Sequence, residues 1–243
     1  MMPDVVCVVP ARMASSRFPG KPLVDIAGVP MVVRSARRAV AAECFSRVVV
    51  ATPDAEIVEV CDRHGLDTLL TPDFSTGTDR VAWAAGRLEA DWVLNLQGDE
   101  PVFPIPLLRE LARLFPDDPD ALWTAADLVL SPGDRDDPDV VKISLGASDP
   151  ADALDFHREI PRGSTGTRWA VHVGVYGGSR EALELFASLP APLEEAERRI
   201  EPLRALAHGM RVRAVTGHWP RAAVDRREHI STVLAELLRE GAQ

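Results

Sequence analysis

Short apolar runs rich in β-branched residues alternate with longer amphipathic stretches in the first half of the chain. Residues 4–9 are mostly valine and predict a fully buried strand, and residues 30–42 follow with helical spacing and arginines on one face. The pattern continues with predicted strands at 47–51, 67–71 and 92–96 and predicted helices at 55–64 and 78–89. This alternation is typical of βαβ units, and it predicts an α/β fold whose twisted, mostly parallel sheet carries helices on both faces.

The second half of the chain is less regular. Predicted strands fall at 121–128, 140–145, 169–176 and 211–216, and predicted helices at 192–208 and 226–239. Segments 116–120 and 131–139, rich in Pro and Asp, are predicted loops, and neither has the character of an interdomain linker. We therefore predict a single domain over 1–243, with one part at about 1–115 and a smaller subregion within about 116–243.

Composition and charge narrow the class of protein. Hydrophobic residues make up 46% of the chain and charged residues 26%, and the net charge of -10 argues against binding to nucleic acid, whose phosphates it repels. The three cysteines form no pair or cluster with zinc-like spacing. The chain has no run of about 18 apolar residues, and its first residues lack the regions of a signal peptide. A cytoplasmic protein without membrane contact is the expectation.

A basic loop follows the first predicted strand. Arg12, Arg17 and Lys21 fall within ten residues, among small residues, Pro and Gly. Because ligands of such sheets bind beyond the carboxyl ends of the strands, this loop can surround a polyphosphate with cations and backbone N–H groups. A solvated basic loop is the alternative. The segment contains neither the P-loop nor the dinucleotide fingerprint.

Two aspartates are candidate magnesium ligands. Asp99 ends an apolar strand and follows a glycine that permits a sharp turn, and Asp225 follows Ala-Ala-Val and precedes a helix. Carboxylate oxygens at such places suit Mg²⁺, which shares its oxygen ligands with substrate phosphates. Helix capping is the alternative for both residues. It is also the alternative for the segment 75–80, with Thr78 as the cap.

The chain resembles the 3-deoxy-manno-octulosonate (KDO) cytidylyltransferases, relatives of the sialic-acid cytidylyltransferases. The resemblance runs from about Val5 to about Val233. The motifs that carry it are Val9-Pro-Ala-Arg-Met-Ala-Ser-Ser-Arg-Phe-Pro-Gly-Lys-Pro-Leu23, Gly77-Thr-Asp-Arg80, Asn95-Leu-Gln-Gly-Asp-Glu-Pro101, Val141-Lys142, His172-Val-Gly-Val-Tyr-Gly177 and Val224-Asp225. It implies a Rossmann-like nucleotidyltransferase fold, with a nucleotide-binding first part and a second part for acceptor binding and dimerisation.

The resemblance implies attack of an acceptor oxygen on the α-phosphorus of CTP, with release of pyrophosphate. It implies Arg12 and Lys21 as catalytic residues, Asp99 and Asp225 as ligands of Mg²⁺, and a homodimer. The implied nucleotide-binding residues are Pro10, Ala11, Arg12, Arg17, Lys21, Thr76, Gly77, Thr78, Arg80 and Gln97. The implied acceptor-binding residues are Gln97, Arg158, His172, Tyr176 and Glu201.

The acceptor side departs from the family pattern. The family's Glu-Gln pair is Glu201-Pro202 here, which removes an amide, and the segment 162–168 is shorter than the family norm. These departures favour a smaller anionic acceptor, a phosphonate such as phosphonoformate from natural-product biosynthesis. KDO is the alternative acceptor. An alternative of another class is a catalytically silent nucleotide-binding regulatory protein.

Overall fold

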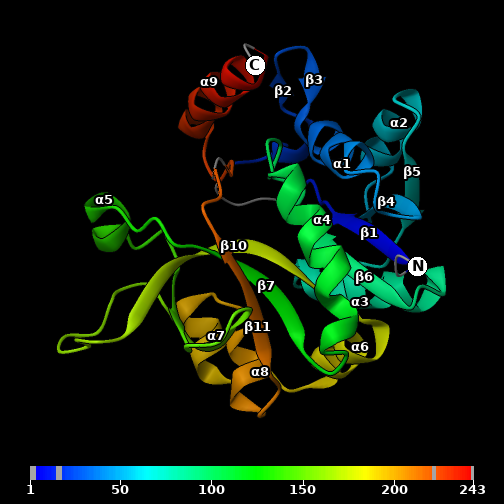
Figure 1. The fold of residues 1–243 in the computed structure, drawn as a ribbon. Coiled ribbons are helices and arrows are strands. Elements are labelled where there is room, and N and C mark those ends of the chain that lie inside the picture. The colour runs from blue at the N-terminus through cyan, green and yellow to red at the C-terminus, as the bar shows by residue number, and fades with distance from the viewer. Residues whose placement is uncertain (1–3, 15–17, 221–222, 242–243) are drawn as a thin grey trace. The chain divides into compact units, whose positions relative to one another are not determined.

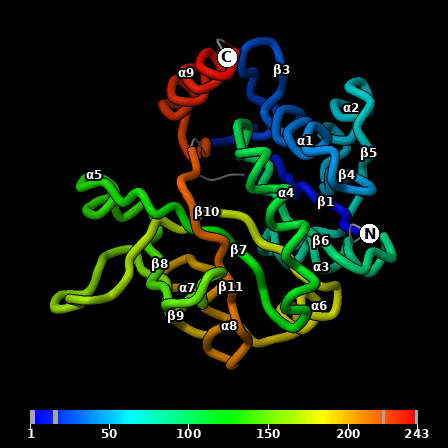
Figure 2. The backbone as a smooth tube through the Cα atoms, viewed as in Figure 1, coloured from blue at the N-terminus to red at the C-terminus, as the bar shows by residue number. Residues whose placement is uncertain are grey.

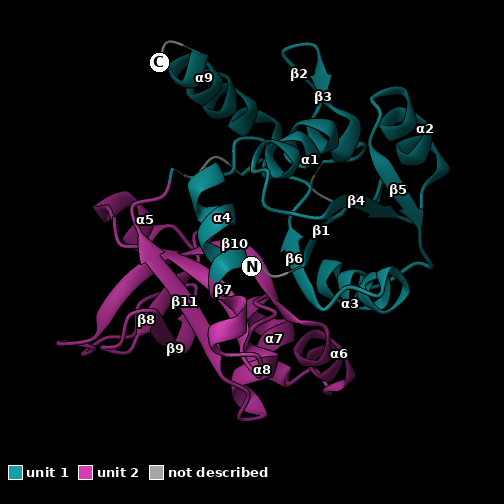
Figure 3. Cartoon of the chain, turned by 45° about the vertical axis from the view of Figure 1, so that its right-hand side comes forward, with its two compact units in different colours: residues 1–113, 220–243 teal, residues 114–219 magenta. Residues whose placement is uncertain are grey.

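The computed structural model describes residues 4–14, 18–220 and 223–241, and it divides the chain into two compact units (Figures 1 and 3). Unit 1 comprises Met1–Arg113 and Pro220–Gln243, and unit 2 comprises Leu114–Trp219. The first boundary lies near the one predicted at 115. The C-terminal segment differs from the prediction, because its contacts group it with the first unit rather than the second.

Unit 1 contains the predicted parallel strands. They lie in the order β5 (Asp67–Leu70), β4 (Arg47–Thr52), β1 (Val5–Pro10) and β6 (Trp92–Leu96), and neighbours in this order pair in parallel. Every residue of β1 is buried, as its continuous apolar run predicts. The helices of this unit are α1 (Met31–Ala41), α2 (Ala55–Arg63), α3 (Gly77–Leu88), α4 (Ile105–Leu114) and α9 (Ile230–Gly241).

Unit 2 is built on mostly antiparallel pairing. Its strands are β7 (Leu122–Asp127), β8 (Lys142–Leu145), β9 (Ala151–His157), β10 (Arg168–Ser179) and β11 (Val212–Gly217). They pair in the order β10-β7-β11-β9-β8, and β8 also pairs with β10, so the ladder closes on itself. A register shift between Val173 and Gly177 bends β10, which pairs with both β7 and β8. The α/β fold is therefore confirmed with a mixed sheet, and the mostly parallel prediction holds only in unit 1.

Several elements of unit 2 differ from the sequence prediction. The helix predicted at 192–208 is two helices, α7 (Leu193–Arg198) and α8 (Leu203–Ala207). The break lies where Arg199 adopts a left-handed conformation and Pro202 removes a backbone donor. The predicted loop 131–139 contains the short helix α5 (Pro132–Asp136), which begins with a capping box at Ser131. Strand β9 and helix α6 (Arg180–Ser188) were not predicted.

The C-terminal helix packs beside an N-terminal hairpin within unit 1. The tube in Figure 2 shows α9 beside the hairpin of β2 (Asp25–Ile26) and β3 (Val29–Pro30). Side chains from both segments share one small core, in which Ile26 and Val233 are fully buried. This core lies next to the chemistry-bearing loops described below.

Candidate active site

Lys21 joins two carboxylate-bearing segments of unit 1. Its Nζ donates to Oδ2 of Asp99 at 2.5 Å and to the backbone carbonyl of Val224 at 3.0 Å. The backbone N–H of Val224 in turn donates to the carbonyl of Asp99 at 2.9 Å. The side chains of Lys21 and Asp99 are 15% and 29% exposed, so a ligand can reach them. The structure thus brings together three predicted residues, Lys21, Asp99 and, next to Val224, Asp225.

Two glycines shape the backbone around this group. Gly20 has a left-handed φ of 72° and precedes the single 3₁₀ turn Lys21–Leu23, which Pro22 favours through its fixed φ. Gly98 stands before Asp99, where an added Cβ would lie 2.8 Å from the carbonyl oxygen of Pro10. Gly98 has no positive φ in the structure. It is therefore required for close approach of two backbone segments rather than for the sharp turn that the sequence suggested.

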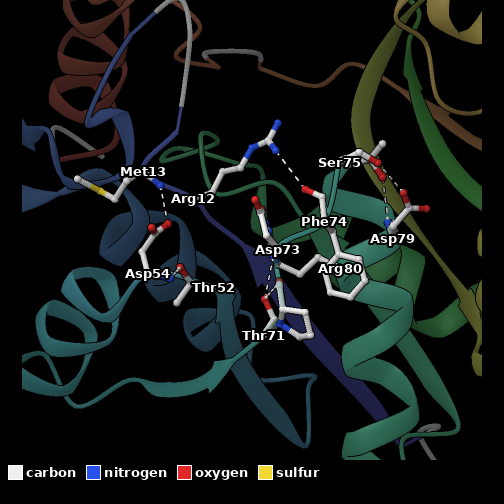
Figure 4. A network of polar contacts seen from close by, with 12 residues as sticks. Arg12, Met13, Thr52, Asp54, Thr71, Asp73, Phe74, Ser75, Asp79 and Arg80 are labelled. Atoms are coloured by element: carbon white, nitrogen blue, oxygen red, sulfur yellow. Dashed lines mark hydrogen bonds and ion pairs between the residues drawn. The ribbon is translucent and has the colours of Figure 1, made fainter.

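Arg12 and Arg80 form a second cationic group of unit 1 (Figure 4). Arg12 is exposed, and its Nη1 donates to the carbonyl of Phe74 at 3.1 Å. Arg80 is 1% exposed, and its Nε donates to Oγ1 of Thr71 at 3.1 Å. Burial, and next the positive charge of Arg12, lower the pKa of Arg80. Two cations held this close favour an anion between or beside them.

The Nη2 atom of Arg80 strengthens this argument. It lies 3.5 Å from Oδ1 of Asp73, and it is buried without a hydrogen-bond partner within the described residues. Buried polar atoms of this kind are rare in folded proteins, so each calls for an explanation. The guanidinium of Arg80 therefore keeps hydrogen-bonding capacity for an anion bound beside Arg12.

Asp54 is a site-forming residue that the sequence reasoning missed. Its Oδ2 accepts the backbone N–H of Met13 at 2.7 Å, and so ties the basic loop to the end of β4 (Figure 4). The backbone N–H of Asp54 donates to Oγ1 of Thr52 at 3.1 Å. An Asp after a strand and before a helix reads as an N-cap, yet here its side chain makes no cap hydrogen bond. The only sequence signal was its place at the carboxyl end of a parallel strand.

The N-terminus of α3 meets the end of β6. Thr76 is the helix cap, because its hydroxyl accepts the N–H of Asp79 at 3.1 Å; the capping role considered for Thr78 is wrong. Thr78 is instead buried, 3.5 Å from Nδ2 of Asn95. A Cβ on Gly77 would lie 3.5 Å from both Gln97 Oε1 and a side-chain carbon of Pro10.

The remaining nucleotide-binding predictions fall around the same loops. Ala11 is buried and its N–H continues the ladder to the carbonyl of Ala51 at 3.0 Å. Gln97 donates through Nε2 to Oδ1 of the fully buried Asn95, a residue not predicted for the site. An asparagine inside an apolar strand was the signal that could have found it. Arg17 lies outside the described residues.

The acceptor-binding predictions gather in unit 2, apart from Gln97. The rings of His172 and Tyr176 stack at 5.5 Å between centroids, and Phe156 meets His172 edge-on at 5.1 Å. Burial, and next the charge of Glu201, raise the pKa of the Tyr176 phenol well above its ordinary value, while Arg158 opposes them. Arg158, His172, Tyr176 and Glu201 are therefore one group, which we call the acceptor set.

Arg158 is held by backbone carbonyls. Its Nε and Nη2 donate to the carbonyls of Arg198 and Arg199 at 2.9 and 3.2 Å. Its Nη1 donates to the carbonyls of Pro138 and Asp139 at 3.2 and 3.0 Å. These contacts fix the guanidinium plane, and one of its five N–H groups stays available for an acceptor oxygen.

His172 is expected to be neutral at neutral pH and to remain so well below the ordinary pKa of a histidine. Burial, and next the charge of Arg158, lower its pKa from 6.5 to about 3. The unfolded chain binds a proton that the folded site refuses, so the free energy of unfolding should fall as the pH decreases from 6.5 toward 3. NMR titration of the His172 ring measures its pKa directly, and a His172→Gln variant assigns the resonance. A titration midpoint near 6.5 would contradict the prediction.

The residues present suit a magnesium ion. The described residues gather no group of three or more His, Cys, Asp or Glu side chains that could hold a metal. Mg²⁺ commonly takes only one or two protein carboxylates and completes its shell with water and substrate phosphates. Asp99 and Asp225, on adjacent backbone segments, offer that number of carboxylates, and Lys21 shows that the place already attracts a cation.

The fold and the cationic loops together define an α/β nucleotidyltransferase. A UDP-glucose pyrophosphorylase in complex with UDP-glucose shares the fold, with a TM-score of 0.72 at 13% identity over 98% of this chain and 99% of that one. A sequence model described as cytidylyltransferase matches residues 6–211. The chain belongs to the cytidylyltransferase family, and within it to the 3-deoxy-manno-octulosonate cytidylyltransferases.

Individual relatives cover nearly the whole chain. A 3-deoxy-manno-octulosonate cytidylyltransferase of Polynucleobacter asymbioticus is 40% identical, over 95% of this chain and 94% of its own. One of Myxococcus xanthus is 43% identical, over 88% and 89%. The structure of a CMP:2-keto-3-deoxy-manno-octonic acid synthetase complexed with CTP superposes with a TM-score of 0.88 at 32% identity, covering 98% and 99%. The chain is a CTP-dependent cytidylyltransferase, which confirms the predicted enzyme class.

Proposed function

We propose that the acceptor is 3-deoxy-manno-octulosonate and that the product is its CMP ester. This was the alternative acceptor of the sequence analysis, and the relatives favour it over a phosphonate. The observation that carries the proposal is the composition of the acceptor set: one guanidinium, one neutral imidazole, one phenol and one carboxylate. Such a set suits a ligand with one carboxylate and several hydroxyls.

Charge distinguishes the two acceptors. Phosphonoformate carries a carboxylate and a phosphonate side by side, and both are anionic. Glu201 would repel them, and Arg158 alone opposes it within the set. The sugar acid places one carboxylate for Arg158, and its hydroxyls can donate to Glu201 and exchange hydrogen bonds with His172 and Tyr176.

The donor chemistry falls to unit 1. Arg12 and Arg80 would bind the triphosphate, and Lys21 would neutralise the charge that develops as an acceptor oxygen attacks the α-phosphorus and pyrophosphate leaves. Most of the acceleration would come from positioning and electrostatics, because no covalent intermediate with the protein is needed. Thr76, Gly77, Thr78 and Gln97 would complete the nucleotide site.

Asp99 and Asp225 would hold Mg²⁺. When bound, the ion would polarise and neutralise the phosphate oxygens of the nucleotide. The protein's own contribution is to hold the two backbone segments together. Lys21 does this by binding Oδ2 of Asp99 and the carbonyl of Val224, which precedes Asp225.

One observation favours a phosphonate acceptor as a second candidate. Pro202, buried at the start of α8, stands where the family has an amide that can hydrogen-bond a polyol. A site without that amide gives up one hydrogen bond to the larger acceptor, which costs it about 1 kcal/mol. A small acceptor loses no hydrogen bond when proline replaces that amide.

Pyrophosphate release from CTP separates the two acceptors. We expect sustained release with 3-deoxy-manno-octulosonate, little with phosphonoformate, and only background without an acceptor. A Pro202→Gln variant, which restores the amide, should lower the KM for the sugar acid by about fivefold and leave the KM for CTP unchanged. Turnover of phosphonoformate with none of the sugar acid would overturn the proposal.

Three further expectations go with this function. None of the helices in the described part of the chain has the length and apolar character needed to cross a membrane. A cytoplasmic location and a homodimer remain predictions, and sedimentation of the purified protein would test the second. Absence of nucleic-acid binding is likewise expected from the net charge of -10.

A further inference from the structure

A small hydrophobic core lies next to the Lys21, Asp99 and Asp225 segments. Three of its buried members come from the chemistry-bearing loops: Phe18, Val102 and Val224. Phe18 precedes Lys21 by three residues, Val102 follows Asp99 by three, and Val224 is adjacent to Asp225. The position of each charged side chain therefore depends on how one neighbouring apolar side chain packs.

Helix α9 closes this core. Val233 is fully buried in it, and Ile230 and Leu237 pack against it from the same helix. The spacing of three and four residues places all three on one face of α9. Leu238, on the same helix, is 76% exposed and contributes nothing to the core. The C-terminal helix thus packs against the loops through this one stripe of apolar side chains.

Arg38 fastens the end of α9 to the rest of unit 1. Its Nη1 and Nη2 donate to the two carboxylate oxygens of Glu240 at 2.9 and 2.7 Å. Its Nε donates to the backbone carbonyl of Phe103 at 2.9 Å, in the segment that follows Asp99 and Val102. One planar guanidinium therefore fixes α9 and the Asp99 loop to α1 at the same time.

We propose that α9 is a positioning element for Lys21, Asp99 and Asp225, held in register by Val233 and by the Arg38–Glu240 pair. It touches neither nucleotide nor metal, and it acts through Phe18, Val102 and Val224. The inference rests on the proposed donor role of these three residues and is independent of which acceptor is used. Loosening α9 should displace the carboxylates and the ammonium relative to one another, and a small displacement of such groups is costly.

Binding of CTP with Mg²⁺ tests the inference without any acceptor. Glu240→Gln keeps the shape of the side chain and removes the negative charge that pairs with Arg38. We expect it to weaken Mg²⁺-dependent CTP binding, measured by calorimetry on folded protein, by about tenfold. Glu236→Gln is the matched control, because it removes a carboxylate from the same helix whose ion-pair partner, Arg239, also lies on α9. It should bind like the wild type.

Further variants show how α9 affects the binding of CTP. Arg38→Lys keeps the positive charge but cannot donate two parallel hydrogen bonds to the Glu240 carboxylate. It should therefore weaken CTP binding as Glu240→Gln does. The double variant should be little worse than either single one, because both remove the same contact. Val233→Ala should act in the same direction, with Leu238→Ala as its exposed control.

The outcomes are distinct. If Glu240→Gln and Arg38→Lys lower only the Tm, and the folded protein binds CTP with Mg²⁺ as tightly as the wild type, α9 is merely structural and the inference is overturned. Should Val233→Ala not fold, the two surface variants still decide. If the wild type itself shows no Mg²⁺-dependent CTP binding, the donor assignment fails rather than the role of α9.

Discussion

Replacing Lys21 with Met is expected to lower kcat for pyrophosphate release by about 10²–10³-fold, since it removes the cation that we propose neutralises the developing charge. The ammonium of Lys21 lies 2.5 Å from Asp99 Oδ2, and no other side chain is placed to take over both of its contacts among the described residues. Quenched-flow or coupled pyrophosphate assays at saturating CTP measure the loss. The chain should remain folded, because a partly exposed ion pair contributes about 1 kcal/mol or less.

The control for this variant is Arg47→Met. It also removes a cation from unit 1, from the exposed Arg47–Asp67 pair at the start of β4. Its kcat should match the wild type. Lys21→Arg should restore only part of the activity, because a planar guanidinium cannot reproduce a point charge with three donors. Activity of Lys21→Met within threefold of the wild type would remove Lys21 from the catalytic residues.

Asp99→Asn is expected to weaken Mg²⁺ binding by about 10–100-fold and to lower turnover at limiting Mg²⁺ in the same proportion. The amide keeps the size of the side chain and removes one of the two carboxylates offered to the ion. It also takes away the charge that orders Lys21. Titration of activity with Mg²⁺ should show the midpoint moving to higher concentration.

Asp67→Asn is the matched control for Asp99→Asn, because Asp67 also pairs with a cation in unit 1 and is 56% exposed. Its Mg²⁺ dependence should not change. Nucleotide consumption by Asp99→Asn at wild-type rate and wild-type Mg²⁺ dependence would show that the metal assignment is wrong.

Much of unit 1 follows from local pattern. A strand buried on both faces needs a continuous apolar run, and residues 5–9 have one, so β1 could be read directly. Residues 47–51 and 92–96 gave the next strands in the same way. Unit 2 was harder, because β9 alternates buried and exposed residues irregularly and Pro202 interrupts an otherwise helical pattern.

The proposed donor residues could be named because they cluster in short motifs, and the motifs carry the family resemblance. Asp54 was not predicted as part of the site. An aspartate before a helix has the same sequence context whether it caps the helix or binds the N–H of Met13. The acceptor is harder to predict from sequence for a related reason, and the relatives favour the alternative acceptor over the phosphonate. The sequence shows that Pro202 replaces an amide. It does not show that His172 is neutral, because that state depends on burial, which a motif does not reveal.

The sequence by itself determined the class of fold, the family and the motifs that hold the proposed site residues, because periodicity and motifs are local properties of the chain. Only the tertiary structure decided which of them meet. Lys21 binds Asp99 across 78 residues and Val224 across 203. Such contacts depend on parallel strands that end at one edge and on a C-terminal helix that returns to it. Tertiary packing likewise determines the burial of Arg80, the backbone hydrogen bonds of Arg158 and the Arg38–Glu240 ion pair.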